Sequence, residues 1–486
     1  MNYKKHFKAD TIKKIDNELT SIPEPSLQMS ELPLKTKKSK PTFLKVTIVV
    51  SSVVLASLTL VIAVPALVII LSGIKTVSSF RPYSAVYQVP QNDDTFVPLN
   101  EVYYPSLDKK SISVSEEYSL AVNNFANDIY QNLNHQEDNI SFSPFGLYSN
   151  LSIVSLASTD EAIEQQFNTL LYLDETLRKE QYSNAYLNDY YQNEDGTTQL
   201  YNGVFQSEAH GTINPVFINL LANYYCEAFS IDFENSSDVN KMIDWANQKI
   251  GEENFLSPSD LSIDENSALY LLTTLYFNNK WETKFVKNES YKDNFYVTPL
   301  EPIEVTYMTH KYYGDYYDYG DYYSFYDYYK NNMKVKYLVC KSNADDIFEL
   351  TDETNIFTDD INVLHKDQVI KNSVPKFSSS SLVDFSSALC QLGYESLFDD
   401  SINSLGNIYT DEVDPIFISE CKQKNKVSFN EDGTTIKSVT WTGFGAGSAG
   451  PMPDGIEVQL NQPFIYIIYD ENDLPLYVGN VVNPSL

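Results

Sequence analysis

The sequence predicts an α+β fold for one large domain, because helical patterns come first along the chain and strand patterns dominate its end. Apolar residues recur at helical spacing in three early segments, 120–133, 147–156 and 216–228. Alternating runs rich in β-branched and aromatic residues follow around 268–277, 457–460 and 464–469. No long linker interrupts residues 114–486, so these elements are expected to form one domain.

Size and charge exclude some classes of protein. A folded part of roughly 370 residues buries about three quarters of the surface that its unfolded chain exposes. Such a core is large enough to be stable without disulfides or bound metals. The 486-residue chain has 34 Lys and Arg against 66 Asp and Glu, a net charge of −32. This balance argues against nucleic-acid binding, which needs a basic footprint. Solubility explains the charge more simply than attraction of a cationic partner does.

Metal-binding and redox motifs are absent from the sequence. Four cysteines lie far apart and form no CxxC pair: Cys226, Cys340, Cys390 and Cys421. The five histidines form no HExxH or other paired motif. We therefore expect no metal and no cofactor, and we expect the cysteines to be buried free thiols, with disulfides optional.

An apolar run near the N-terminus predicts a membrane anchor. Residues 46–74 are 29 uncharged residues, and a short polar tail at 1–45, expected to be disordered, precedes them. As a helix the run is about 43 Å long, which exceeds the roughly 30 Å hydrocarbon core and allows a tilt or a bend near Pro65. A cleaved signal peptide, which would leave the protein secreted, is the alternative, and the 45 residues before the run disfavour it.

The flanks of the apolar run predict its orientation. Five lysines lie within residues 35–45, whereas only Lys75 and Arg81 follow closely behind the run. The positive-inside rule then places the N-terminus in the cytoplasm and everything after residue 75 outside the cell. Residues 75–113 hold four prolines among polar residues, so we expect an extracytoplasmic stalk that leads to a domain at 114–486.

The most biased stretch is 312–329, in which ten of eighteen residues are tyrosine. Aromatic ladders of this kind can bind carbohydrate or peptide. A pair of amphipathic strands with an exposed tyrosine-rich turn is the simpler interpretation.

Five sequence blocks, in order along residues 114–486, resemble the serpins. Four internal blocks are Asn139–Pro144 (NISFSP), Tyr276–Glu282 (YFNNKWE), Val305–Met308, and Pro375–Phe377 (PKF) with Leu389–Gly393 (LCQLG). The chain ends with NQPF at 461–464 and PLYVGNVVNP at 475–484. The resemblance implies three β-sheets with surrounding helices, an exposed reactive loop, and no catalytic residue of the protein's own.

The segment Val427–Thr434 (VSFNEDGT) resembles the opening of the serpin reactive loop. In this family a target protease cleaves the exposed loop and becomes covalently attached to it. The freed segment then enters the main sheet as a new strand and distorts the protease, driven by stored folding energy. The resemblance thus implies a monomeric inhibitor of a serine or cysteine protease.

The hinge of that loop begins with Glu431 and Gly433. Strand insertion would bury every second side chain of the hinge, so those side chains must tolerate burial. The inward set holds no charge and no proline: Thr434, Ile436, Ser438 and Thr440. Ile436 is larger than the small residues that serpin inhibitors usually carry there. Overpacking of a crowded interface costs about 1–3 kcal/mol, so we expect Ile436 to slow insertion.

The resemblance also implies residues at the top of the main sheet and beneath it. Trp281 is expected at its top. Of the polar shutter cluster beneath it, Ser143 is kept, while Gly146, Thr273 and Gln423 replace the serine, asparagine and histidine that are usual in the family.

The scissile bond has two candidates. Counting from the hinge gives Gly447–Ser448, and counting back from the C-terminal NQPF gives Met452–Pro453. Proline after the scissile bond blocks most serine proteases, so the first is preferred. A protease that reads Gly, Ala or Phe444 would be elastase-, subtilisin- or chymotrypsin-like.

Two other functions compete with inhibition. Residues 446–450 nearly read GxSxG, but prolines follow and no histidine occurs after His365, which disfavours a hydrolase. A serpin fold without inhibition, acting as a surface binding or scaffold module, remains open.

Overall fold

The computed structural model describes residues 97–133, 138–264, 266–342, 345–411, 414–436 and 455–486. All of them belong to one structural unit. The predicted tail, the predicted transmembrane segment and part of the predicted stalk lie outside these residues. Within the described ranges, no helix has the length and apolar character needed to cross a bilayer.

Eight α-helices are present in the described residues. They are α3 (Glu116–Gln131), α4 (Pro144–Ser155), α5 (Glu161–Leu170), α6 (Glu175–Asn188), α7 (Pro215–Leu221), α8 (Ser236–Ile250), α9 (Ile347–Thr351) and α10 (Ser386–Leu389). The first six each follow a Ser, Asp or Asn whose side chain accepts a backbone N–H of the first turn.

One predicted helix is too long. The pattern at 216–228 continues past Leu221, but the chain passes through a short 3₁₀ turn and reaches Tyr225 in the left-handed region (φ 50°). From Cys226 it is a strand, because it joins the edge of a sheet. The strands predicted around 268–277, 457–460 and 464–469 are present as β5 (Leu269–Lys280), β14 (Ile456–Gln459) and β15 (Phe464–Tyr469).

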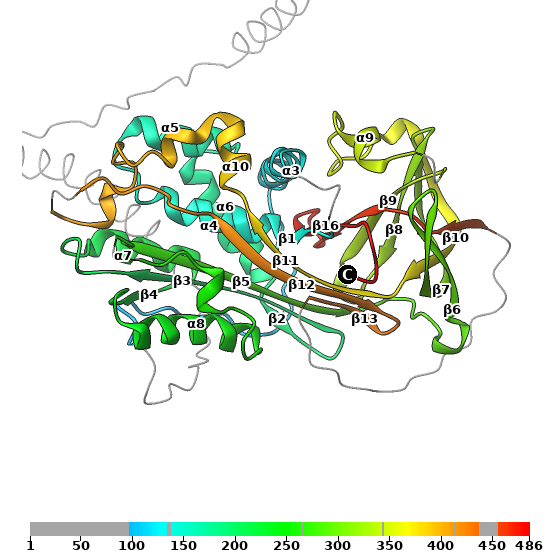
Figure 1. The fold of residues 1–486 in the computed structure, drawn as a ribbon, viewed down its shortest axis with the longest axis horizontal. Helices are drawn as coiled ribbons and strands as arrows, with labels where there is room; N and C mark the ends of the chain where they lie inside the picture. The colour runs from blue at the N-terminus through cyan, green and yellow to red at the C-terminus, as the bar shows by residue number, and fades with distance from the viewer. Residues whose placement is uncertain (1–96, 134–137, 265, 343–344, 412–413, 437–454) are drawn as a thin grey trace, which may run out of the picture. The chain divides into compact units, whose positions relative to one another are not determined.

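The main sheet has seven strands and lies between helices (Figure 1). Its order is β11 (Phe377–Asp384), β12 (Lys422–Asn430), β13 (Gly433–Ile436), β5, β3 (Gly196–Gln206) and β2 (Tyr191–Gln192), with β4 (Cys226–Ser230) also paired to β3. In Figure 1, α8 covers one face, and α4 and α6 lie on the other.

The second sheet has nine strands. The order is β1 (Ser141–Phe142), β16 (Pro475–Val481), β15, β9 (Lys334–Cys340), β8 (Tyr322–Tyr328), β7 (Glu301–Asp318), β10 (Leu364–Pro375) and β14, with β6 (Tyr291–Thr298) paired to β7. The family resemblance implied three sheets. The hydrogen-bonded ladders form two, because the 18-residue strand β7 pairs with β6, β10 and β8 in succession.

The tyrosine-rich stretch belongs mainly to the core. It forms the end of β7 and all of β8, as the predicted strand pair requires. The turn is exposed at Gly320 and Asp321, as expected, but its tyrosines pack against the domain: Tyr322 is buried, and Tyr319 stacks on it at 4.7 Å. The Asp359 carboxylate accepts the Tyr326 hydroxyl at 2.5 Å, which provides one of the buried phenols with a partner. Tyr313 is the exposed exception.

Residues 97–113, the described part of the predicted stalk, pack along the outer edge of the main sheet. The Leu99 N–H donates to the Ala228 carbonyl of β4 at 2.6 Å, and Gln192 of β2 donates to the Leu107 carbonyl at 2.8 Å. Tyr104 is buried against Tyr190. These contacts fix the segment as part of the folded unit.

All four cysteines are free thiols. Three of them are buried, and Cys390 is partly exposed.

Candidate functional site

The hinge lies inside the main sheet. The chain leaves β12 at Asn430, turns at Glu431 and Asp432, and returns as β13 between β12 and β5 (Figure 1). Gly433 pairs with Asn430 on one side and with Lys280 on the other, and the antiparallel ladders continue to Ile436. The hinge residues from Gly433 to Ile436 are therefore a strand with two neighbours.

Close packing at the start of β13 requires glycine. A Cβ atom at Gly433 would lie 2.2 Å from the Asn279 carbonyl oxygen, which no side chain tolerates.

Thr434 connects the hinge to an aromatic stack. Its side chain is fully buried, and its hydroxyl accepts a hydrogen bond from the Tyr329 hydroxyl at 2.7 Å. The Trp281 ring stacks on Tyr329 with 4.4 Å between centroids. The Trp281 indole N–H donates to the Asn430 carbonyl at 2.9 Å. Trp281 is thus at the top of the main sheet, beside the turn that leads into the hinge.

The Glu431 carboxylate holds that turn against neighbouring strands. It forms an ion pair with Lys376 and accepts the Ser290 hydroxyl at 2.9 Å. Burial on its own raises the pKa of Glu431, but the hydrogen bonds from Lys376 and Ser290 outweigh it and hold the pKa below its usual value. Sequence reasoning missed both Tyr329 and Lys376 as hinge partners.

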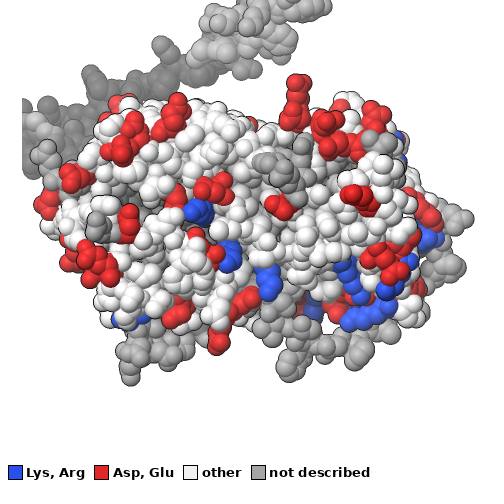
Figure 2. All heavy atoms as spheres, viewed as in Figure 1, with Lys and Arg blue, Asp and Glu red and all other residues white. Residues whose placement is uncertain are grey.

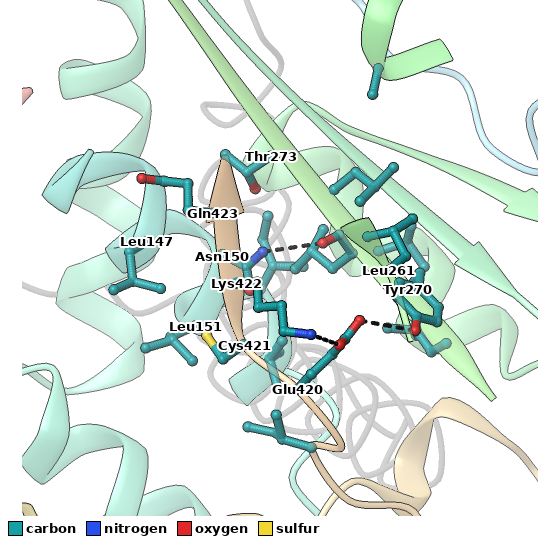
Figure 3. Close-up of a pocket in the computed structure, with 18 of the residues that line it drawn as sticks. Leu147, Asn150, Leu151, Leu261, Tyr270, Thr273, Glu420, Cys421, Lys422 and Gln423 are labelled. Atoms are coloured by element: carbon teal, nitrogen blue, oxygen red, sulfur yellow. Dashed lines mark hydrogen bonds and ion pairs between the residues drawn. The ribbon is translucent and has the colours of Figure 1, made fainter. Parts of the chain in front are cut away.

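Below Ile436 the main sheet has an opening. In the described residues no ladder joins the lower parts of β5 and β12, and a cavity of about 230 Å³ lies between them. Leu147 and Leu151 of α4 line it on one face of the sheet. Figure 3 shows Thr273 on β5 and Gln423 on β12 at its rim. The cavity therefore occupies the space that a longer β13 would fill.

The predicted shutter residues do not form one cluster, because Gln423 binds Ser143 while Thr273 binds Asn202. The Gln423 side-chain oxygen accepts the Ser143 N–H at 2.6 Å, and the Ser143 hydroxyl accepts the Gly146 N–H at 3.0 Å. Thr273 donates its hydroxyl proton to the Asn202 side chain of β3 at 2.8 Å. Gln423 thus fastens β12 to α4, and Thr273 fastens β5 to β3. Asn202 is a further site residue that the sequence did not single out.

The remaining predicted residues lie outside the described part of the chain. They are Ser438, Thr440, Gly447, Ser448, Met452 and Pro453. The chain is described again from Gly455, one residue before β14, which pairs in parallel with β10.

A main sheet that holds the start of a loop between its central strands, above a cavity, is the arrangement that the resemblance to serpins predicts. Residues 120–484 match the family model described as serpin (serine protease inhibitor). The chain belongs to the serpin family. Serpins are protease inhibitors rather than enzymes, which fits the expectation that this chain has no catalytic activity.

Similar proteins support this assignment. The chain is 25% identical over 398 residues to alpha-1-antiproteinase 2 of Equus caballus, covering 80% of this chain and 92% of that protein. An uncharacterized serpin-like protein of Methanosarcina acetivorans is 24% identical over 407 residues, covering 81% and 92% respectively.

A solved serpin from a thermophile, tengpin, matches the fold. Its native state superposes with a TM-score of 0.69 at 21% identity, covering 80% of this chain and all of that one. Its latent state gives a lower TM-score of 0.63. The fold as a whole is therefore more similar to the native form of that serpin than to its latent form.

Proposed function

We propose that the chain is a membrane-anchored serpin that inhibits a serine or cysteine protease by covalent trapping after loop cleavage. One observation carries the proposal. The hinge already forms a strand with two neighbours, and an open cavity continues its path between β5 and β12. A cleaved loop could therefore extend the strand that β13 has begun, into the space of the cavity.

The ladder register supports the assignment of inward residues. Each step along β13 moves one position down both neighbouring strands. A strand continued in this register would place Ser438 between Asn425 and Leu275. It would place Thr440 between Gln423 and Thr273, where two polar side chains at the rim of the cavity could receive its hydroxyl.

Ile436 should slow insertion less than its size alone suggests. Its side chain is already buried in the uncleaved fold, with only 3% of its surface exposed, and it lines the upper part of the cavity. The cost of accommodating it is therefore part of the uncleaved fold. The inward residues that follow, Ser438 and Thr440, are small, so Ile436 does not oppose the later steps of insertion.

The target and the location of the protein complete the proposal. Cleavage at Gly447–Ser448 suits an elastase-, subtilisin- or chymotrypsin-like protease, and Met452–Pro453 is the second candidate. Residues 46–74 span the membrane, with the N-terminus in the cytoplasm, and the serpin domain works outside the cell as a monomer. The apolar run and its lysine-rich flank support this placement.

The decisive experiment incubates the full chain, solubilised in detergent, with excess subtilisin-like or elastase-like protease. An SDS-stable adduct of inhibitor and protease is expected. Clean cleavage near residues 444–449 with full protease activity retained would contradict inhibition.

A non-inhibitory binding module is the second candidate. The altered shutter supports it, because Thr273 and Gln423 are bound to different partners. Thyroxine-binding globulin in complex with thyroxine is among the solved relatives, with a TM-score of 0.61 at 17% identity, covering 76% of this chain and all of that one. Cleavage without an adduct would favour this function.

The membrane proposal has its own test. After expression in cells, the full chain should stay with the membrane fraction at high salt, and added protease should reach the serpin domain without lysis. Deletion of 46–74 should release the protein from that fraction. Retention of the deleted chain in the membrane would contradict the anchor.

A further inference from the structure

Three lysines line one edge of the cavity in the main sheet. Lys422, Lys424 and Lys426 occupy alternate positions of β12, so their side chains share one face of the sheet. All three line the cavity. The intervening Gln423 faces α4, where it meets Ser143.

The segment between α8 and β5 meets these lysines. We refer to residues 251–263 as the strap. Lys424 contacts both carboxylate oxygens of Asp260, at 2.8 and 2.9 Å. Lys426 pairs with Glu252 at 3.2 Å. These two ion pairs join β12 to the strap, and the strap residue Asp260 also lines the cavity.

Lys422 completes the row at the lower end. It donates to the Ser262 hydroxyl at 3.2 Å and to the Glu420 carboxylate at 2.6 Å. Glu420 in turn accepts the Tyr270 hydroxyl of β5 at 3.0 Å (Figure 3). Polar contacts thus cross from β12 to the β5 side at three levels of the cavity.

The other side of the strap is apolar. Leu256, Leu261 and Ile263 pack against a buried cluster that includes Tyr270 of β5 and Met242 of α8. The strap is therefore held to β5 and α8 by hydrophobic contacts and to β12 mainly by ion pairs. Separation of β5 from β12 would break the ion pairs first.

We propose that the row of lysines and the strap form an ionic clasp that limits how fast the main sheet admits the cleaved loop. This proposal rests on the proposed function and concerns its regulation. Insertion beyond Ile436 requires β5 and β12 to accept a strand between them, and the clasp resists that step. A strand continued in the register of β13 would bring Lys437 opposite Lys426, where two like charges repel.

Ionic strength should therefore act as a regulator. Partly exposed ion pairs weaken as the Debye length falls from about 10 Å at 0.1 M salt to about 3 Å at 1 M. Faster insertion leaves less time for hydrolysis of the covalent intermediate. The ratio of adduct to cleaved free inhibitor should rise with salt.

The test compares the full chain with Lys424→Met and with the double variant Lys424→Met/Lys426→Met, using excess subtilisin-like protease at 0.05 and 0.5 M NaCl. The ratio of adduct to cleaved inhibitor should rise about fivefold at low salt for the double variant, as loss of roughly 1 kcal/mol implies. Its salt dependence should largely disappear. Glu252→Gln, a conservative change on the strap, should give a smaller rise and guards against misfolding of the lysine variants.

Lys371→Met is the matched control, because Lys371 pairs with Glu457 at 2.9 Å on the second sheet, away from the cavity. It should leave the ratio unchanged. Equal ratios and equal salt dependence in the unmodified chain and the three clasp variants would overturn the clasp while leaving inhibition intact. Absence of adduct from the unmodified chain would instead overturn the proposed function.

Discussion

Position 434 tests the hinge with a single side chain. Thr434 is fully buried between β12 and β5 and bound to Tyr329, so a charged side chain has no place there. Thr434→Arg should expel β13 from the sheet and abolish the SDS-stable adduct while the loop is still cleaved. Thr434→Val, which keeps the shape and loses one hydrogen bond, is the control and should still form adduct. Undiminished adduct from Thr434→Arg would contradict the hinge assignment.

Two buried carboxyl groups predict a pH dependence of stability. Asp189, at the end of α6, has no hydrogen-bond partner for either carboxylate oxygen. Burial raises its pKa well above the usual value, as does the nearby Asp470. Burial also raises the pKa of Asp470, to about 6, against hydrogen bonds from Leu474 and Asn472. Lys109 opposes both shifts, while Glu471 raises the pKa of Asp189.

The sign follows from proton linkage. From about pH 4 up to the raised pKa values of these two groups, the folded protein holds more protons than the unfolded chain. Their contribution to stability is therefore greatest near pH 4 and falls as the pH rises through 6. The denaturation midpoint should be higher at pH 5 than at pH 7.5. Asp189→Asn should flatten this slope, because position 189 then no longer binds a proton. A slope that the substitution leaves unchanged would assign the dependence to other groups.

At the residue scale, the sequence identified side chains but not their partners. The alternation rule and the family resemblance singled out Thr434 and Trp281. Their common partner Tyr329 is 105 residues from Thr434 in sequence and is one of ten tyrosines in a biased stretch. Nothing in this repetitive stretch distinguishes Tyr329 from the other nine tyrosines. Lys376 was noted only as part of the PKF block, because an ion pair with Glu431 depends on how two strands meet.

At the element scale, the segment 97–113 carries a prediction about stability. It lies before residues 120–484, which match the family model. Tyr104 is 4% exposed, stacks on Tyr190 at 5.7 Å, and has the Lys249 ammonium 5.2 Å from its ring centroid. Tyr104→Ala should lower the free energy of unfolding by about 3 kcal/mol, measured by chemical denaturation.

The adjacent tyrosine offers a matched control. Tyr103 is half exposed, so Tyr103→Ala should change the free energy of unfolding by less than about 0.5 kcal/mol. Equal effects of the two substitutions would show that the segment does not stabilise the fold.

Helices and strands were predicted well where the apolar pattern of the sequence matches the burial of the same residues in the fold. The helices at 120–133 and 147–156 and the strands near 268–277 and 464–469 follow their apolar period. The pattern failed at 216–228, where pairing with β3 draws the second half into a strand. It also gave no sign that 97–113 would dock on a sheet edge, because polar residues and prolines resemble a stalk until their partners are known.

At the scale of the whole molecule, charge covers the surface unevenly. Figure 2 shows acidic side chains scattered over the visible face, with fewer lysines, which lie between its centre and the end that carries β6 and β7. A predominantly acidic surface of this kind fits the net charge of −32 and the exclusion of nucleic acid as a partner.

The main sheet itself predicts a large change in heat resistance after cleavage. A strand that fills the cavity would add backbone hydrogen bonds to both β5 and β12 and bury the apolar side chains of α4 that line it. At about 1 kcal/mol for each added hydrogen bond, roughly ten bonds together with the newly buried apolar surface should raise the melting temperature by about 15 °C. The full chain and the chain cleaved by a limiting amount of subtilisin-like protease should be compared by calorimetry in the same detergent. Cleaved Thr434→Arg should show no rise, since its hinge cannot start the strand. An unchanged melting temperature after cleavage of the unmodified chain would mean that its sheet does not accept the loop.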